Sequence, residues 1–345
     1  MNSVKRRIIL MGTGPFAVPS FEAIRAAGHE VPLVITRPRP PVKSRRGPPP
    51  APVHDWAVAH GLPLESPDSI NEDAVVQRLA ELEADLMVVC DYGQILRPAA
   101  LATTRWGGIN LHGSLLPAYR GAAPVQRAVL SGDLETGVSV IHMTPRLDGG
   151  PILATRRTPI GTTETSGELE ERLSAIGVQA TIEAIELLDQ SLVGHDPAEP
   201  LPTLGAVQDP ARVSKAPRLH KAEAEIDWSR SARHIDCLVR GMQPWPIAYT
   251  FAETKPGKPP VRLAIVRVTA RPDAAADDAQ IGHLLVSDTK DEMAIGCGDG
   301  RIIVERLQPA GKKEMDAAEF IRGHRLQAGF RFGMATPTEN TSPQV

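Results

Sequence analysis

Residues 85–90 read Asp-Leu-Met-Val-Val-Cys, a short apolar run without polar alternation. Such a run is typical of a strand that is buried on both faces, as strands inside parallel sheets are. A second run of this kind, Arg7–Met11, lies earlier in the chain, and helix-like stretches separate the two. The stretch therefore predicts an α/β domain built on a mostly parallel sheet.

The segments on either side continue this alternation. We expect further strands at Val31–Ile35, Gly107–His112 and Thr136–Met143. Helices are expected over Phe16–Ala27, Val53–His60, from a capping box at Ser69 and Glu72 to Leu82, and from a capping box at Thr165 and Glu168 to about Leu188. The pattern predicts a Rossmann-like fold with right-handed crossovers, in which ligands bind beyond the carboxyl ends of the strands.

The pattern changes after about Val207. Five β-rich runs separated by turn residues then follow and predict a small β-barrel: Ile247–Ala252, Val261–Val268, Ile281–Val286, Glu292–Cys297 and Arg301–Leu307. We expect a first domain over residues 1–190, a linker over 191–207, a second domain over 208–331 and a polar, disordered tail over 332–345.

The composition excludes several classes of protein. The chain has 345 residues and only three cysteines, Cys90, Cys237 and Cys297, which are far apart. They argue against a disulfide framework and a cysteine-rich zinc site, and they fit a reducing cytoplasm. No apolar run approaches the ~20 residues that span a membrane. The ten histidines lack a metal-ligand spacing, so we expect no metal.

Charge is distributed unevenly along the chain. Residues 1–205 carry 18 Lys and Arg against 23 Asp and Glu, a net of −5, whereas residues 206–331 carry 20 against 17, a net of +3. The positive second half weakly favours a polyanionic partner, and ordinary scatter of charge explains it equally well.

Two polar residues stand out at the end of a predicted strand. Asn110 and His112 are two positions apart, so both side chains point to the same face. An amide and an imidazole at the carboxyl edge of a parallel sheet could stabilise an oxyanion. Asp148, in a loop with two glycines, could orient His112, or it could be an ordinary turn carboxylate.

The surrounding motifs resemble those of the folate-dependent formyltransferases. They comprise Asn110–Pro117 (NLHGSLLP), Tyr119–Pro124 (YRGAAP), Arg146–Leu153 (RLDGGPIL), the early GTGPFAVP and Asp85–Leu96 (DLMVVCDYGQIL). Two positions depart from the family's pattern. Gly14-Pro15 varies the early motif, and Asp91 stands where a small apolar residue is usual.

The resemblance implies roles for individual residues. Asn110, His112 and Asp148 become the catalytic residues, with 10-formyltetrahydrofolate as the formyl donor and no metal. The implied folate-binding residues are Ser114, Leu115, Leu116, Pro117, Tyr92, Gly93, Ile95 and Leu96, with main-chain groups around Ile95–Arg97 contacting the pterin edge.

Two features indicate which acceptor receives the formyl group. Thr36–Pro52 is rich in proline and arginine and has no acidic residue; it is either a solvated linker or a phosphate-binding loop. Its position resembles a tRNA-inserting loop in those family members that act on methionyl-tRNA. The motifs KAEAEIDW, QPWPI and LQPAGKKEM, starting at Lys221, Gln243 and Leu307, resemble the second, OB-like domain of the same subgroup.

The resemblance therefore implies formyl transfer to the amino group of methionyl initiator tRNA. The implied tRNA-binding residues are Arg37, Arg39, Lys43, Arg45, Arg46, Lys221, Lys312 and Lys313. Trp228 and Trp245 are either stacking platforms or, more commonly for tryptophan, core residues. We expect a cytoplasmic monomer that binds folate and tRNA and no membrane.

Two other functions are compatible with parts of the sequence. Gly12-Thr13-Gly14 after a first strand could belong to a dinucleotide-binding oxidoreductase, but Ala17 replaces the third glycine and no acidic residue follows the second strand. A non-enzymatic RNA-binding protein would account for the barrel and the basic loop. It would leave Asn110, His112 and Asp148 without a role.

Overall fold

The computed structural model describes residues 5–39, 49–192, 194–195, 201–255, 257–272, 280–286 and 292–333. The chain forms two compact units. The first consists of residues 1–125, 134–160 and 168–218, and the second of residues 126–133, 161–167 and 219–345. The second unit thus includes two short segments from within the first half of the chain. The boundaries expected at 190 and 208 stay a prediction.

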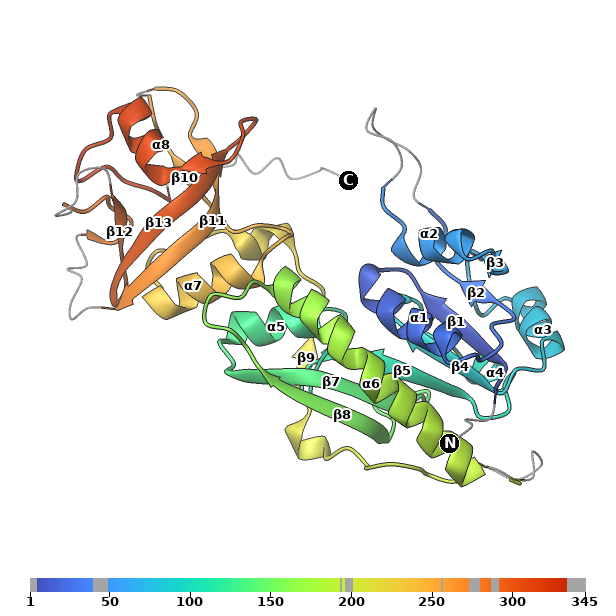
Figure 1. Cartoon of the computed structure of the whole chain (residues 1–345). Helices are drawn as coiled ribbons and strands as arrows, with labels where there is room; N and C mark the ends of the chain where they lie inside the picture. The colour runs from blue at the N-terminus through green and yellow to red at the C-terminus, as the bar shows by residue number, and fades with distance from the viewer. Residues whose placement is uncertain are drawn as a thin grey trace, which may run out of the picture. The chain divides into compact units, whose positions relative to one another are not determined.

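A seven-stranded sheet forms the centre of the first unit (Figure 1). Its strands are β1 (Ile8–Gly12), β2 (Val34–Ile35), β3 (Leu64–Glu65), β4 (Leu86–Cys90), β5 (Gly108–His112), β7 (Glu135–His142) and β8 (Ile152–Pro159). They lie in the order β3-β2-β1-β4-β5-β7-β8. The first five are mutually parallel, whereas β7 and β8 are antiparallel to their neighbours. The predicted Rossmann-like, mostly parallel sheet is confirmed.

The strand order reverses between β1 and β4, which are neighbours in the sheet. From β1 the chain proceeds outward to β2 and β3, and from β4 it proceeds the other way to β5. Gly12 at the end of β1 lies opposite Cys90 at the end of β4. The crevice beyond such a reversal is where open α/β sheets bind ligands.

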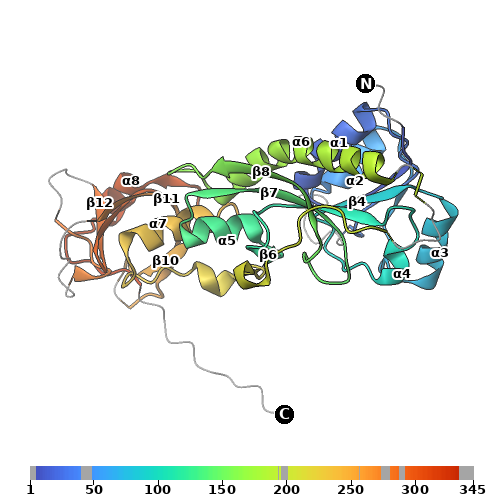
Figure 2. The ribbon, with the colours of Figure 1, turned by 90° about the horizontal axis from the view of Figure 1, so that it is seen from below.

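Helices cover both faces of this sheet. The helices of the first unit are η1 (Pro15–Ala17), α1 (Val18–Ala26), α2 (Pro52–Ala59), α3 (Asp73–Glu81), α4 (Pro98–Leu101), α6 (Ser166–Leu192) and η2 (Pro210–Arg212), whereas most of α5 (Pro124–Ser131) belongs to the second unit. Figures 1 and 2 show α1 and α6 on one face and α3 and α4 on the other. Leu79 of α3 and Leu101 beside it share a core with Met11 and Val89 of the sheet. No helix among the described residues is long and apolar enough to cross a membrane.

Four local predictions differ from the structure of this unit. Only Val34 and Ile35 of the run from Val31 form a strand, since Pro32 cannot donate a ladder hydrogen bond. β3 was not predicted because it has only two residues, and β8 was not predicted because it is partly exposed and charged. The capping box at Ser69 is wrong: α3 begins at Asp73, and the Ser69 hydroxyl accepts from the Asn71 amide instead.

The second unit contains an antiparallel sheet with the order β10-β11-β13-β12, to which β14 adds by pairing with β13. Its elements are η3 (Lys221–Ala224), α7 (Ala232–Gly241), β10 (Tyr249–Ala252), β11 (Val261–Pro272), β12 (Met293–Cys297), β13 (Gly300–Pro309), β14 (Met315–Asp316) and α8 (Ala317–His324). A register shift between Ile265 and Arg267 interrupts the β11–β13 ladder. The curled sheet is consistent with the predicted OB-like domain. The run Ile281–Val286 forms isolated bridges rather than a strand.

Two short parallel strands complete the first unit. β6 (Arg120–Gly121) pairs with β9 (Lys215–Ala216). Gly121 has a φ of +130°, and a Cβ there would lie 2.6 Å from the Ala216 carbonyl oxygen. Only glycine fits this close approach. The pairing ties the chain after residue 200 to the segment that follows His112.

Candidate active site

Asn110 and His112 lie at the carboxyl end of β5, on one face of the sheet. Asn110 is opposite Val89 of β4. Leu111, which lies between Asn110 and His112 in the sequence, faces α6, because a Cβ on Gly177 of α6 would lie 2.7 Å from the Leu111 side chain. Both polar residues therefore face away from α6, as their spacing predicted. The Asn110 side-chain amide makes no hydrogen bond within the part of the chain that the structure describes. It is free to bind a ligand.

The His112 imidazole is buried, with 6% of its side chain exposed. Its Nε2 lies 2.9 Å from the Tyr119 carbonyl oxygen. A carbonyl only accepts hydrogen bonds, so Nε2 carries a proton. Nδ1 is the other ring nitrogen, and it faces Asp148.

Asp148 lies in the loop between β7 and β8. Its Oδ2 is 3.9 Å from His112 Nδ1 and accepts a hydrogen bond of 2.9 Å from the Gly121 amide. The separation from Nδ1 is within the range of an ion pair but too long for a direct hydrogen bond. Asp148 has a φ of +47°, a left-handed conformation that aspartate tolerates better than most residues. The loop thus directs a carboxylate toward His112.

A buried glutamine, Gln208, supports this loop. Its Nε2 donates to the main-chain oxygens of Asp148 at 2.8 Å and Gly150 at 2.7 Å. Its Oε1 accepts from Arg120 Nε at 3.1 Å and Nη2 at 2.6 Å. Gln208 therefore uses every donor and acceptor of its amide to join the Asp148 loop to Arg120. Sequence reasoning missed this residue, since no motif marks it.

The segment Ser114–Pro117 follows His112 and packs into the unit. Ser114 is fully buried, and its hydroxyl donates to the Ala118 carbonyl at 2.7 Å. Ser139 of β7 donates to the Ser114 carbonyl and accepts from the Leu116 amide, at 2.8 and 3.1 Å. Leu115 packs beside Gly137 of β7, and Leu116 and Pro117 are buried. These residues can shape a binding site but offer few polar groups to a ligand.

The other predicted folate segment follows β4. Tyr92 and Leu96 are buried in the core, whereas Gly93 and Ile95 are exposed. The Asn71 side chain donates to the Ile95 carbonyl and accepts from the Arg97 amide, both at 2.8 Å. Two of the main-chain groups that we expected to meet the pterin are therefore already bonded within the protein. Asn71 fixes this loop, and sequence reasoning did not identify it.

Tyr92 carries a buried hydroxyl that has no hydrogen-bond partner among the described residues. Burial raises its pKa to about 12, although the charge of Arg37 opposes the shift. Arg37 lies beside Gly93, where a Cβ would be 3.4 Å from its Nη1. The base of the basic loop thus lies next to the predicted folate segment.

The predicted tRNA-binding residues have different surroundings. Arg39 forms an ion pair with Asp55 of α2 and lies 2.9 Å from His54 Nδ1. Lys43, Arg45 and Arg46 lie outside the described residues. Lys221 in η3 is exposed, as are Lys312 and Lys313 in the turn between β13 and β14.

The two tryptophans of the second unit also differ. Trp228 is 4% exposed and donates from Nε1 to Thr250 Oγ1 at 3.1 Å, so it belongs to the core. Trp245 is 52% exposed. Of the two, Trp245 alone has an aromatic ring that a nucleic-acid base could reach.

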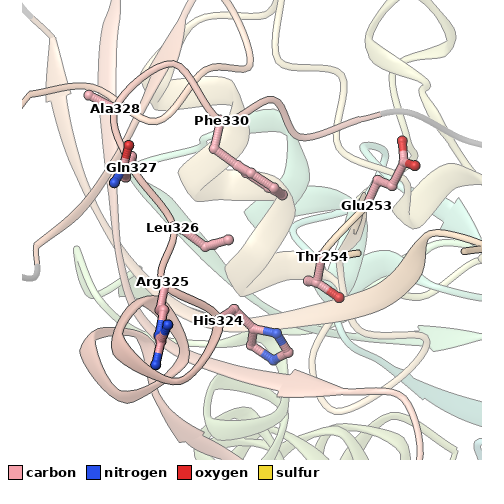
Figure 3. Close-up of a pocket in the computed structure, with 8 residues that line it drawn as sticks. All are labelled: Glu253, Thr254, His324, Arg325, Leu326, Gln327, Ala328 and Phe330. Carbon is pink, nitrogen blue, oxygen red and sulfur yellow. The ribbon is translucent and has the colours of Figure 1, made fainter. Parts of the chain in front are cut away.

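A shallow pocket of about 500 Å³ lies in the second unit, and Figure 3 shows Leu326, Phe330 and Thr254 among its walls. Its lining residues are Glu253, Thr254, His324, Arg325, Leu326, Gln327, Ala328 and Phe330. None of them is a predicted site residue. The described residues contain no group of three or more His, Cys, Asp or Glu that could hold a metal ion.

Comparison with known proteins identifies the family. Residues 5–185 match the formyl transferase family, and residues 218–325 match the formyl transferase C-terminal domain. The chain is 64% identical to methionyl-tRNA formyltransferase of Rhodopirellula baltica over 94% of its own length and 95% of the relative's. This chain belongs to the methionyl-tRNA formyltransferase family. It is also 41% identical to the methionyl-tRNA formyltransferase of Parvibaculum lavamentivorans, over 94% and 98% of the two chains.

A solved structure shares the fold. It is an N-formyltransferase from Helicobacter canadensis in complex with folinic acid and dTDP-3-aminofucose. The TM-score is 0.61 and the identity 17%, over 88% of this chain and 99% of the other. The predicted membership of the folate-dependent formyltransferases is confirmed by the family match. The oxidoreductase and non-enzymatic alternatives are set aside.

Proposed function

We propose that the protein transfers a formyl group from 10-formyltetrahydrofolate to the α-amino group of methionyl initiator tRNA, giving N-formylmethionyl-tRNA. The observation that carries the proposal is the convergence of Asn110, His112 and Asp148 at the carboxyl edge of β5. A free amide, an imidazole nitrogen and a carboxylate there suit acyl transfer to an amine. Membership of the methionyl-tRNA formyltransferase family supports this donor and acceptor.

In this reaction the protein must orient the two reactants and stabilise the negative charge that develops on the formyl oxygen. An α-amine has a pKa near ~7.7–8.0, so a nucleophilic fraction exists at neutral pH. Its nitrogen attacks the formyl carbon, and the carbonyl oxygen becomes an oxyanion. The bond from carbon to N10 of the folate then breaks, and the proton lost by the amine is transferred to N10. Orientation and oxyanion stabilisation lower this barrier.

Each catalytic residue has a distinct part in this proposal. The Asn110 amide, which has no hydrogen-bond partner among the described residues, donates to the oxyanion. His112 also donates, and because Tyr119 holds the Nε2 proton, it does so through Nδ1. Asp148 lies 3.9 Å from Nδ1, where its carboxylate orients the imidazole. Asp148 also helps to move the amine proton through a bound water.

The binding residues are proposed on the same basis. Ser114, Leu115, Leu116 and Pro117 shape the folate site, and Tyr92, Gly93, Ile95 and Leu96 form its second wall. Contacts with tRNA come from Arg37, Arg39, Lys43, Arg45 and Arg46 in the basic loop and from Lys221, Lys312 and Lys313 in the C-terminal domain over residues 208–331. We infer that the protein acts as a monomer in the cytoplasm.

The test is transfer of labelled formyl from 10-formyltetrahydrofolate to an acceptor. Methionyl initiator tRNA should be formylated, whereas methionyl elongator tRNA, glycinamide ribotide and dTDP-amino sugars should react far more slowly. No transfer to methionyl-tRNA by folded protein would refute the function. If glycinamide ribotide or a dTDP-amino sugar were formylated as fast as methionyl initiator tRNA, the proposed acceptor would be refuted and formyl transfer itself would stand. Light scattering in the same buffer measures the oligomeric state.

A further inference from the structure

A carboxylate and a glycine meet beyond the ends of β1 and β4, where the strand order reverses. Gly14 lies two residues after β1, and Asp91 directly follows β4. The Thr13 amide donates to the Asp91 carbonyl at 3.1 Å, and the Thr13 hydroxyl donates to the Tyr92 carbonyl at 3.3 Å. The two loops are therefore joined at the edge of the sheet that is expected to bind substrates.

Gly14 is required by the Asp91 side chain, not by the backbone. Its φ of −83° and ψ of 176° are open to any residue. A Cβ at this position, however, would overlap Asp91 Oδ2. The carboxylate thus occupies the space that a side chain at position 14 would take.

The Asp91 carboxyl group lies in a confined place. Asp91 is exposed as a residue and has a φ of +48°. Burial nevertheless raises the pKa of its carboxyl, and a backbone hydrogen bond from Gly14 opposes that shift.

The segment after Gly14 leads from Asp91 to His112. Phe16 is buried, and its Cζ would lie 3.5 Å from a Cβ on Gly113, the residue that follows His112. The Phe16 carbonyl accepts from Ser174 of α6 at 3.0 Å, which fixes the turn from the other side. Movement of the Gly14 segment would therefore reach the His112 loop through Phe16.

We propose that Asp91 is a positioning residue for formyl transfer. Its carboxylate packs against Gly14 and thereby fixes the position of the predicted folate loop, Tyr92–Leu96, relative to the loop that carries His112. The inference rests on the proposed function. Asp91 need not touch either substrate in this role. It keeps the predicted folate loop and the His112 loop in the relative positions that the reaction needs.

The test is a cycle of the variants Asp91→Ala, Gly14→Ala and the double variant. The methyl of Gly14→Ala displaces the carboxylate, so each single change removes the same contact. Since each change removes the contact between the Asp91 carboxylate and Gly14, we expect each single variant to raise the KM for 10-formyltetrahydrofolate about tenfold, which corresponds to ~1.4 kcal/mol. The double variant should be no worse than either single variant, and the KM for tRNA should stay unchanged.

Asp91→Asn is the conservative control, because its amide oxygen still accepts from Gly14; it should keep the folate KM within about threefold of the unchanged protein. If the increases in the folate KM of the two single variants multiplied in the double variant, the proposal would be overturned. So would equal increases in the KM for folate and for tRNA, or an Asp91→Asn variant as impaired as Asp91→Ala.

A second measurement separates this proposal from the proposed function. Amide hydrogen exchange at Thr13 and Phe16 requires no catalysis, and it should accelerate equally in Asp91→Ala and Gly14→Ala. If the unchanged protein transferred no formyl group but exchange followed this pattern, the function would fail and the Asp91–Gly14 contact would stand. Unchanged exchange in both variants would refute the contact itself.

Discussion

Replacing Gln208 by alanine should slow formyl transfer although Gln208 lies outside the catalytic residues. The change removes two hydrogen bonds to the carbonyls of Asp148 and Gly150 and two from Arg120. A neutral hydrogen bond contributes ~0.5–1.5 kcal/mol and one to a charged group ~1.5–3 kcal/mol. Since Arg120 is partly exposed and such terms are not additive, we expect a loss of about 2–4 kcal/mol in the stability of the loop.

The loss should appear mainly in kcat. The Asp148 carboxylate lies 3.9 Å from His112 Nδ1, so a loop released from Gln208 moves this carboxylate away from that nitrogen. A displacement of about 1 Å at a catalytic group can lower the rate ~10²-fold. Steady-state kinetics with saturating methionyl-tRNA should show this fall, with little change in the KM for tRNA.

Two further variants sharpen the experiment. Gln208→Glu keeps the acceptor for Arg120 but places a carboxylate oxygen against two carbonyls, so it should impair kcat at least as strongly as alanine. Gln243→Ala is the matched control, because Gln243 Nε2 also donates to two carbonyls, those of Val239 and Val266, but within the second unit. It should lower the melting temperature and spare kcat. Equal losses of kcat in Gln208→Ala and Gln243→Ala would refute the reasoning.

Three other predictions concern catalysis, tRNA binding and pH. Asp148→Asn keeps the shape of the side chain but removes the charge near His112, so the rate of a single turnover should fall ~10³-fold while tRNA affinity is retained. Weakened tRNA binding would contradict the catalytic role of Asp148. Lys312→Ala and Lys313→Ala should each raise the KM for tRNA and reduce the slope of log K against log salt by ~1; an unchanged slope would exclude these lysines from phosphate contact. Because burial raises the pKa of Tyr92 to about 12, its contribution to stability is complete below pH ~10 and lost as the pH rises through 12. Ultraviolet titration of Tyr92→Phe against the unchanged protein measures this step, and ionisation near pH 10 would contradict it.

The parts of the fold that sequence could predict are those with a strong local pattern. β1 and β4 are apolar on both faces, and strands of this kind lie buried inside parallel sheets. The common face of Asn110 and His112 follows from the alternation of side chains along a strand.

The parts that sequence could not predict depend on distant partners. Gln208 meets the Asp148 carbonyl across 60 residues of sequence, and Asn71 meets the Ile95 carbonyl across 24. Neither contact leaves a local signal. At Ser69 the local signal was misleading. The Ser69 hydroxyl accepts a hydrogen bond from the Asn71 amide rather than capping a helix, and the Asn71 side chain accepts from the Arg97 amide of the neighbouring loop.

The most direct test of the central claim is the rate of a single turnover by His112→Ala, measured with enzyme in excess over labelled methionyl initiator tRNA and with saturating 10-formyltetrahydrofolate. If His112 stabilises the oxyanion beside Asn110 and Asp148, this rate should fall by ~10³-fold while the dissociation constant for the tRNA stays within a few fold of the unchanged protein. A variant that binds the tRNA and transfers formyl at nearly the original rate would contradict the account.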